Sequence, residues 1–208
     1  MHLVLLGDSI LDNGAYVARG GSVAELLQEQ LGQSGRVSLV AQDGAVIGGT
    51  LEQLRRLPPD ASHLIISAGG NDALRNTGVL LERATSVAQA LSKIEPVRDA
   101  FARGYRQMLD AAQATQLPTA LCTIYDVQFP DPAQRRLANL ALGILNDVIT
   151  REAARRRWPV IDLRVLFNEA ADYANAIEPS AAGARKIAVV ATRIAREHDF
   201  GGASSFYS

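Results

Sequence analysis

The sequence predicts an α/β protein with a mostly parallel sheet and helices on both faces. The apolar runs are short and nearly continuous, as strands that are buried on both faces require. Segments with helical periodicity separate these runs, which is the order that βαβ units produce. The length of 208 residues suits one domain with a sizeable core. The predicted strands are Leu3–Leu6, Val37–Ala41, Leu64–Ser67, Ala120–Ile124 and Val160–Leu163.

The predicted helices stand between and after these strands. Ser22–Leu31 carries its apolar residues on one helical face, and Ser92–Ala114 repeats apolar residues at spacings of three and four. Pro132–Arg157 begins with a proline, which suits the first turn of a helix. Ser180–Glu197 forms the last helix. The stretch Asn76–Ala90 has no clear pattern, and we expect either a helix over the rim of a site or a packing element.

Composition and charge exclude some classes of partner. The formal net charge is −1, which gives no electrostatic basis for binding nucleic acid or an anionic membrane. The basic run Arg155-Arg156-Arg157 follows a helical pattern and Glu152, so we interpret it as a solvated helix end. No apolar stretch approaches the roughly 20 residues that span a bilayer. The single cysteine, Cys122, lies in an apolar run and is expected in the core.

The chain is expected to form one domain. Residues 1–200 contain no internal repeat and no linker, and the small, polar residues 201–208 predict a short flexible tail. The N-terminus runs directly into the first strand and has no charged region before a long apolar stretch. It does not look like a signal peptide, so we expect a cytoplasmic protein.

Three short blocks carry the chemistry. Gly7-Asp8-Ser9 follows the first strand, Gly69-Gly70-Asn71-Asp72 follows the third, and Glu178-Pro179-Ser180 opens the last helix. In this order the blocks resemble the SGNH (GDSL-type) hydrolase superfamily, and the resemblance extends from Leu3 to about Ala195. It implies a three-layer α/β/α fold with a flavodoxin-like, mostly parallel, five-stranded sheet. It also implies a serine esterase that needs no cofactor and no metal.

Ser9 corresponds to the nucleophile of that superfamily. A serine directly after a buried parallel strand lies at the carboxyl end of the sheet, where ligands collect. Taken alone, such a serine is more often a helix cap or a turn residue. The two downstream blocks favour the nucleophile, and Asp8 is expected to accept backbone amides around the turn.

The resemblance assigns the oxyanion hole to a backbone N–H after the second strand and to Asn71. The ending Gly-x-Thr favours Gly48 for the backbone donor, with Gly44 as the alternative, and either can be a simple loop glycine. The Asn71 amide is a neutral donor for the developing oxyanion. Its alternative role is that of a turn residue or helix cap.

The third block departs from the superfamily pattern. A His normally precedes the last Pro-Ser, with an Asp three residues earlier, whereas this chain has Glu178 and Asn175 at these positions. The three histidines do not replace it, because His2 and His63 begin strands and His198 ends the last helix. All three are expected at the surface.

Glu178 is therefore the predicted general base, since a carboxylate within reach of a serine hydroxyl can accept its proton. Burial would raise its pKa from about 4.3 toward neutrality. Asn175 could hold Glu178 by a hydrogen bond, and Asp172 could share a proton with it. The opposing interpretation is that Glu178 caps the last helix and that catalysis is lost.

The sequence predicts a small soluble ester as substrate. Tyr125 and Phe129 follow the fourth strand and should line the crevice, and the alternative is that they close the core. Metal-ligand spacings and glycine-rich phosphate loops are absent. Two other functions remain open: a binding protein that has kept the pocket and lost the base, and an acyltransferase that uses the same nucleophile. The sequence does not predict the oligomeric state.

Overall fold

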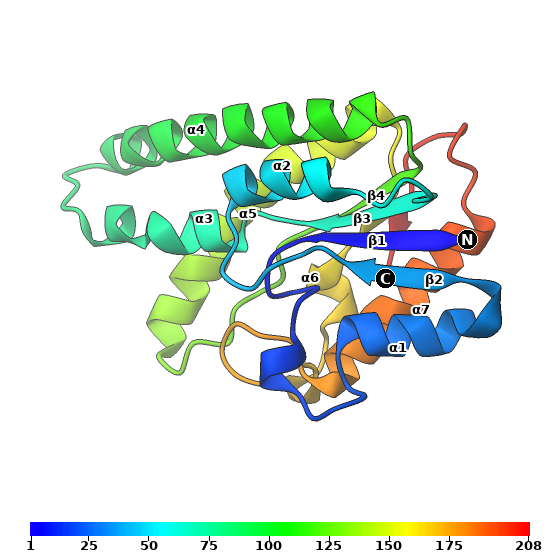
Figure 1. Cartoon of the computed structure of the whole chain (residues 1–208). Helices are drawn as coiled ribbons and strands as arrows, with labels where there is room; N and C mark the ends of the chain where they lie inside the picture. The colour runs from blue at the N-terminus through cyan, green and yellow to red at the C-terminus, as the bar shows by residue number, and fades with distance from the viewer.

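The computed structural model describes residues 1–208 and has three layers, with a parallel sheet between two layers of helices (Figure 1). The strand order is β2-β1-β3-β4-β5-β6, and every neighbouring pair is parallel. The first five strands follow the flavodoxin-like order, so the predicted fold class is confirmed. The strands are β1 (His2–Gly7), β2 (Arg36–Leu39), β3 (His63–Ser67), β4 (Thr119–Cys122), β5 (Val160–Ile161) and β6 (Phe206–Tyr207).

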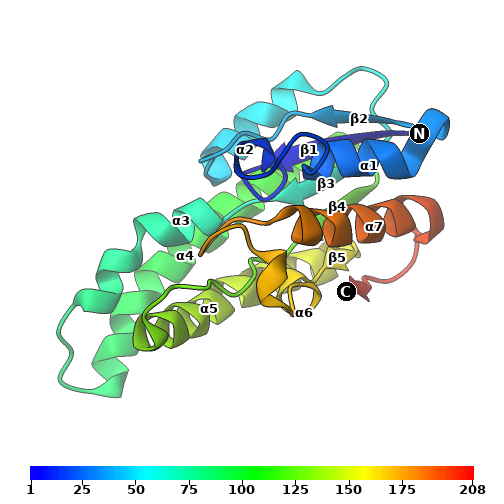
Figure 2. The same cartoon turned by 90° about the horizontal axis from the view of Figure 1, so that it is seen from below.

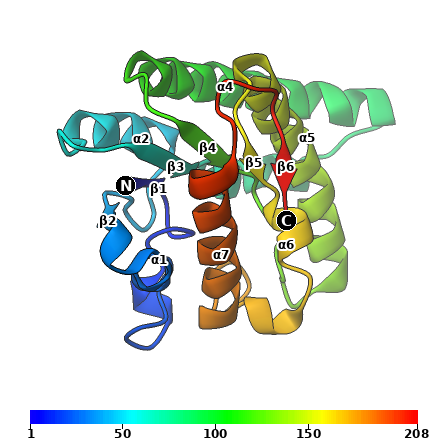
Figure 3. The same cartoon turned by 90° about the vertical axis from the view of Figure 1, so that its right-hand side faces the viewer.

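The helices divide between the two faces of the sheet. Helices α1 and α7 lie side by side on one face, and α2, α4 and α5 cover the other (Figures 2 and 3). None of the helices is both long and apolar enough to cross a lipid bilayer. The α-helices are α1 (Val23–Leu31), α2 (Ile47–Gln53), α3 (Gly70–Arg75), α4 (Val87–Ala114), α5 (Pro132–Arg156), α6 (Leu163–Leu166) and α7 (Ala181–Glu197). The 3-10 helices are η1 (Gly14–Tyr16), η2 (Gly32–Ser34), η3 (Leu54–Arg56), η4 (Thr77–Leu81) and η5 (Ala170–Asp172).

Strand β1 shows how the apolar runs build both halves of the core. Leu3 and Leu5 pack in the cluster with α1 and α7, whereas Val4 and Leu6 pack in the cluster with α4 and α5. All four side chains are fully buried. Because successive side chains of a strand point to opposite faces, a strand between two helical layers must be apolar at every position.

The sheet has six strands where five were expected. The sixth, β6, lies in the tail that the sequence predicted to be flexible, and it pairs in parallel with β5. The Val160 amide donates to the Ser205 carbonyl at 2.8 Å, and the Asp162 amide donates to the Tyr207 carbonyl at 2.8 Å. A two-residue strand is too short to show periodicity in a sequence.

Helix α4 begins at Val87, five residues before the predicted start, and carries Pro96 within it. Ser86 caps this end, because its hydroxyl accepts a hydrogen bond from the Gln89 amide at 3.1 Å. The short helices α2, α3 and α6 were not predicted. Gly48, the predicted backbone donor, lies in the first turn of α2.

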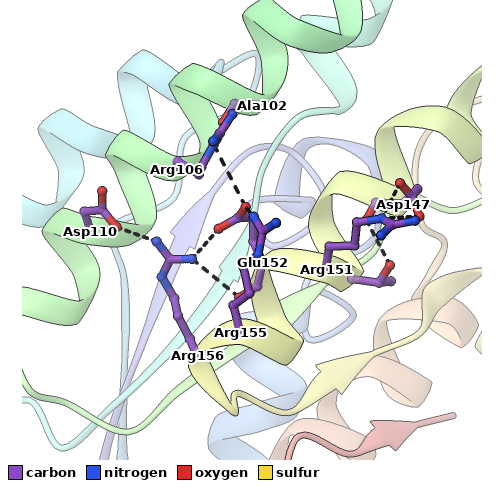
Figure 4. Close-up of polar contacts among 9 residues, drawn as sticks. Ala102, Arg106, Asp110, Asp147, Arg151, Glu152, Arg155 and Arg156 are labelled. Carbon is purple, nitrogen blue, oxygen red and sulfur yellow. Dashed lines mark hydrogen bonds and ion pairs between the residues drawn. The ribbon is translucent and has the colours of Figure 1, made fainter.

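The basic run at the end of α5 is only partly solvated. The Arg156 side chain is 10% exposed and pairs with buried Glu152 at 2.5 Å and with Asp110 of α4 (Figure 4). Arg155, 64% exposed, also pairs with Glu152. The interpretation of the run as a wholly solvated helix end was therefore wrong for Arg156, which joins α5 to α4.

Candidate active site

Ser9 follows the end of β1, where β1 and β3 approach closely. Gly7 has a φ of +125°, and a Cβ atom at this position would lie 1.6 Å from the Ser67 carbonyl oxygen, so only glycine fits. The next amide, of Asp8, donates to that same carbonyl at 3.1 Å. These contacts place Ser9, 6% exposed, at the carboxyl end of the sheet.

Asp8 lies beneath the turn that holds Ser9. Its Oδ1 accepts hydrogen bonds from the Ile10 amide at 3.3 Å and from the Ser67 hydroxyl at 3.1 Å. The backbone contact confirms the expected role of Asp8 in the turn. Burial raises the pKa of Asp8 to about 7, although both hydrogen bonds lower it, and the nearby charge of Glu178 raises it further.

Glu178 contacts the Ser9 hydroxyl directly. The Ser9 Oγ donates to Glu178 Oε1 at 3.2 Å, which lies within reach for proton transfer. The side chain is buried, and its second oxygen, Oε2, has no hydrogen-bond partner. Burial raises the pKa of Glu178 to about 7, the hydrogen bond from Ser9 lowers it, and the negative charge of Asp43 raises it.

Glu178 does not cap helix α7. The N-cap is Ser180, whose hydroxyl accepts from the amides of Ala182 at 3.0 Å and Gly183 at 3.2 Å. The carboxylate is therefore free of the structural role that would explain its presence without catalysis.

The two residues expected to assist Glu178 are engaged elsewhere. Asn175 is exposed, and its side chain accepts from the Ile177 amide at 2.9 Å in a local turn. Asp172 is buried and pairs with Lys186 at 2.7 Å, and it also accepts from the Glu169 amide at 3.0 Å. The suggestion that Asp172 shares a proton with Glu178 is not supported by these contacts.

Asn13, which the sequence analysis did not single out, and the hydroxyl of Tyr125 fix the position of the Glu178 segment. Asn13 is fully buried, accepts from the Val23 amide at 2.9 Å and donates to the Pro179 carbonyl at 3.3 Å. The Tyr125 hydroxyl donates to the Ile177 carbonyl. Both contacts join residues far apart in the chain, so no local pattern in the sequence could have identified them.

Asn71 lies in the first turn of α3, after Gly69 with its φ of +117°. One amide hydrogen of Asn71 is donated to the Ala45 carbonyl at 3.0 Å. A second hydrogen remains, since an asparagine amide carries two donors. Asn71 lines the same cavity as Ser9 and Glu178.

Gly48 is not at this cavity. It lines a second cavity, between α2 and α4, together with Phe101 and Gly104. Ser9 does not line this second cavity. The alternative, Gly44, has a φ of +75° and directly precedes Ala45, the residue that accepts from Asn71. The Gly44 amide forms no hydrogen bond within the chain.

The cavity beside Ser9 has a volume of about 110 Å³, and 17 of its 25 lining residues are hydrophobic. Ser9, Asp8 and Glu178 form its polar end, and both Tyr125 and Phe129 line it, as expected. Two residues of η4, Val79 and Leu80, also line it, which places part of the unclear stretch 76–90 at the rim. No lysine, arginine or histidine lines the cavity, and the chain contains no group of three or more His, Cys, Asp or Glu residues that could hold a metal ion.

The histidines all lie away from this end of the sheet. His2 and His63 begin β1 and β3, and His198 follows α7. His2 is not at the surface as expected: it is 4% exposed, and its ring contacts Ser38 at 2.8 Å. None of the three lines the cavity, so Glu178 is the ionisable group in contact with Ser9.

Comparisons with known proteins concern the family and the fold of the chain. The sequence model of the GDSL-like lipase/acylhydrolase family matches residues 5–186. No curated protein matches the chain. The fold is similar to that of a lipolytic G-D-S-L family protein from Veillonella parvula, with 17% identity and a TM-score of 0.72 over 95% of this chain and 100% of the other.

Two Streptomyces enzymes have similar folds. The extracellular lipase of Streptomyces rimosus shows 19% identity and a TM-score of 0.64, over 89% of this chain and 95% of the other. Phospholipase A1 of Streptomyces albidoflavus shows 19% identity and a TM-score of 0.65, over 88% and 93%. At these identities the likeness concerns the fold alone.

Proposed function

The chain belongs to the GDSL-like lipase/acylhydrolase family, and on this premise we propose that it hydrolyses small soluble carboxylic esters through an acyl-enzyme on Ser9. The observation that carries the proposal is the hydrogen bond from Ser9 Oγ to Glu178 Oε1 at 3.2 Å. It pairs a nucleophile with a buried proton acceptor, which is the arrangement that activates serine hydroxyls.

The reaction proceeds in two halves. Ser9 Oγ attacks the ester carbonyl carbon while Glu178 takes the hydroxyl proton. The bond to the leaving oxygen then breaks, and Glu178 returns the proton to the departing alcohol. In the second half, water gives a proton to Glu178 and attacks the acyl-enzyme, and the proton returns to Ser9 as the acid leaves.

The environment of Glu178 compensates for the weak basicity of an ordinary carboxylate. An unperturbed Glu has a pKa of about 4.3, far below the value of about 6.5 that makes histidine effective near neutral pH. Burial raises the pKa of Glu178 to about 7. A base with a pKa near the working pH combines a large ionised fraction with a useful proton affinity.

The oxyanion would be stabilised by neutral donors near Ser9. Asn71 offers its free amide hydrogen, and the amides of Ser9 and Gly44 form no hydrogen bond within the chain. Buried donors without acceptors are uncommon in folded proteins, and they are expected where a ligand supplies the acceptor. The buried Ser9 amide is therefore the backbone donor that this cavity supports, since neither Gly44 nor Gly48 lines it.

Replacing Asn71 by alanine is expected to lower kcat by about 10²–10³, the usual cost of losing one oxyanion donor. KM should change less, because the donor acts on the charge that develops in the transition state. Steady-state kinetics with a 4-nitrophenyl ester measure both constants. A variant that loses thermal stability but keeps kcat would show that Asn71 is only a turn residue.

The proposal is tested most directly with a fluorophosphonate probe, which labels serines that are activated as nucleophiles. Labelling should be confined to Ser9, as read by mass spectrometry, and should proceed together with loss of ester hydrolysis. A protein that binds esters but is neither labelled nor active would be a binding protein. An acyltransferase would be labelled as well, and added alcohols would then take most of the acyl group in preference to water.

A further inference from the structure

We propose that the apolar cavity beside Ser9 binds the acyl group, and that the preferred substrates are esters of uncharged aliphatic acids of intermediate length. This inference depends on the proposed role of Ser9. It selects one substrate class among the many that an ester hydrolase of this fold could use.

The walls of the cavity extend away from Ser9 and are almost wholly apolar. The segment after Asn71 supplies one wall, helix α4 a second and helix α5 a third. Their apolar side chains include Leu74, Leu80, Ile94, Val97, Ala141 and Leu142. An aliphatic chain in this space would replace water against hydrocarbon along its whole length.

The charges of the cavity lie only at its Ser9 end. Asp8 and Glu178 are the only acidic residues that line it, and no basic residue does. A carboxylate at the far end of an acyl chain would be surrounded by side chains of α4 and α5 that cannot pair with it. Burial of an unpaired charge is costly, so the cavity should select against dicarboxylic half-esters.

The position of Glu178 determines which half of the ester enters the cavity. Glu178 must return its proton to the leaving oxygen, so the alcohol part lies on its side of Ser9. The apolar walls come mainly from α3, η4, α4 and α5, beyond Asn71, whereas the Glu178 segment adds only Ile177. The acyl part is therefore the one that points between the helices.

The volume sets the expected chain length. At about 110 Å³ the cavity is larger than the roughly 30 Å³ that one water molecule occupies in the liquid, so it holds several carbon atoms. Each methylene that is fully buried should raise kcat/KM by about fourfold, which corresponds to about 0.8 kcal/mol. The gain should stop once the chain reaches the end of the cavity.

The first experiment measures kcat/KM for 4-nitrophenyl esters from acetate to dodecanoate. We expect a rise over the first added methylenes and then a plateau or a fall. In Ala141→Phe the new ring should occupy the cavity and flatten the profile. Leu140→Phe is the matched control, since Leu140 neighbours Ala141 on α5 but is 73% exposed and does not line the cavity.

A second measurement needs no variant. Mono-4-nitrophenyl adipate and 4-nitrophenyl 6-methylheptanoate have the same shape but differ by one negative charge. We expect the neutral ester to react at least tenfold faster in kcat/KM. Equal rates, a flat chain-length profile, or a chain-length preference seen for alkyl acetates in place of acyl esters would each overturn the proposal.

A binding experiment separates this inference from the proposed function. Calorimetry of the Ser9→Ala protein with octanamide, a neutral amide, should show binding that weakens when Ala141→Phe is added. Binding with this pattern in a protein that hydrolyses no ester would refute the esterase and leave the cavity assignment standing. Hydrolysis of 4-nitrophenyl acetate by the parent protein, without octanamide binding to Ser9→Ala, would support the esterase and refute the cavity assignment.

Discussion

Replacing Ser9 by alanine is expected to remove ester hydrolysis almost completely. Without the hydroxyl no acyl-enzyme forms, and the residual rate can come only from binding and the oxyanion donors. In a serine protease this loss is about 10⁶-fold in kcat, and we expect a loss of at least about 10³-fold here. Single-turnover kinetics with a 4-nitrophenyl ester measure it.

Ser67→Ala is the matched control for this variant. Ser67 is as buried as Ser9, lines the same cavity and carries a hydroxyl that donates to Asp8 and not to Glu178. It should keep most of the turnover. If Ser9→Ala retained the parent rate, or if Ser67→Ala lost as much as Ser9→Ala, the assignment of the nucleophile would be wrong.

The sequence predicts those features of the fold that depend on local patterns. Strand β1 could be recognised because both of its faces are buried and every position from Leu3 to Leu6 is apolar. Helix α2 could not, because Ile47-Gly48-Gly49-Thr50 combines glycines with β-branched residues, which are poor helix formers. Strand β6 is held by two backbone hydrogen bonds to β5, and no side-chain pattern marks it.

The residues of the candidate site were likewise predictable where a local sequence motif marks them. Pro179-Ser180 fixed the register of the last block, and Ser9, Asn71 and Glu178 do lie around one cavity. The glycine donor stays a prediction, because neither Gly48 nor its alternative Gly44 lines this cavity. The contacts of Asn13 with Pro179 and of Tyr125 with Ile177 join distant segments, so they appear only once the chain has folded.

The acidic limb of the pH profile should belong to Glu178. Because the base acts in its ionised form, log(kcat/KM) should rise with pH below the pKa of Glu178, about 7, and level off above it. Asp8, also with a pKa near 7, interacts with Glu178, so the measured limb reports the pair until variants assign it. The negative charge of Asp43 raises the pKa of Glu178. Removing that charge should therefore shift the acidic limb to lower pH without abolishing the limb.

Glu178→Gln removes the base while nearly preserving its shape. We expect kcat/KM to fall by about 10²–10⁴, the contribution of a positioned general base, and the limb near pH 7 to disappear. Asp8→Asn should retain a limb, displaced to lower pH because a neighbouring negative charge is lost. Glu178→His should recover activity with a limb nearer about 6.5, the ordinary pKa of histidine.

These variants separate the base from a carboxylate that merely shapes the pocket. If Glu178→Gln kept the parent rate and profile while Asp8→Asn lost both, the proton acceptor would be Asp8. The hydrogen bond argues for the first outcome, since the Ser9 hydroxyl donates to Glu178 Oε1, whereas Asp8 Oδ1 is occupied by Ile10 and Ser67.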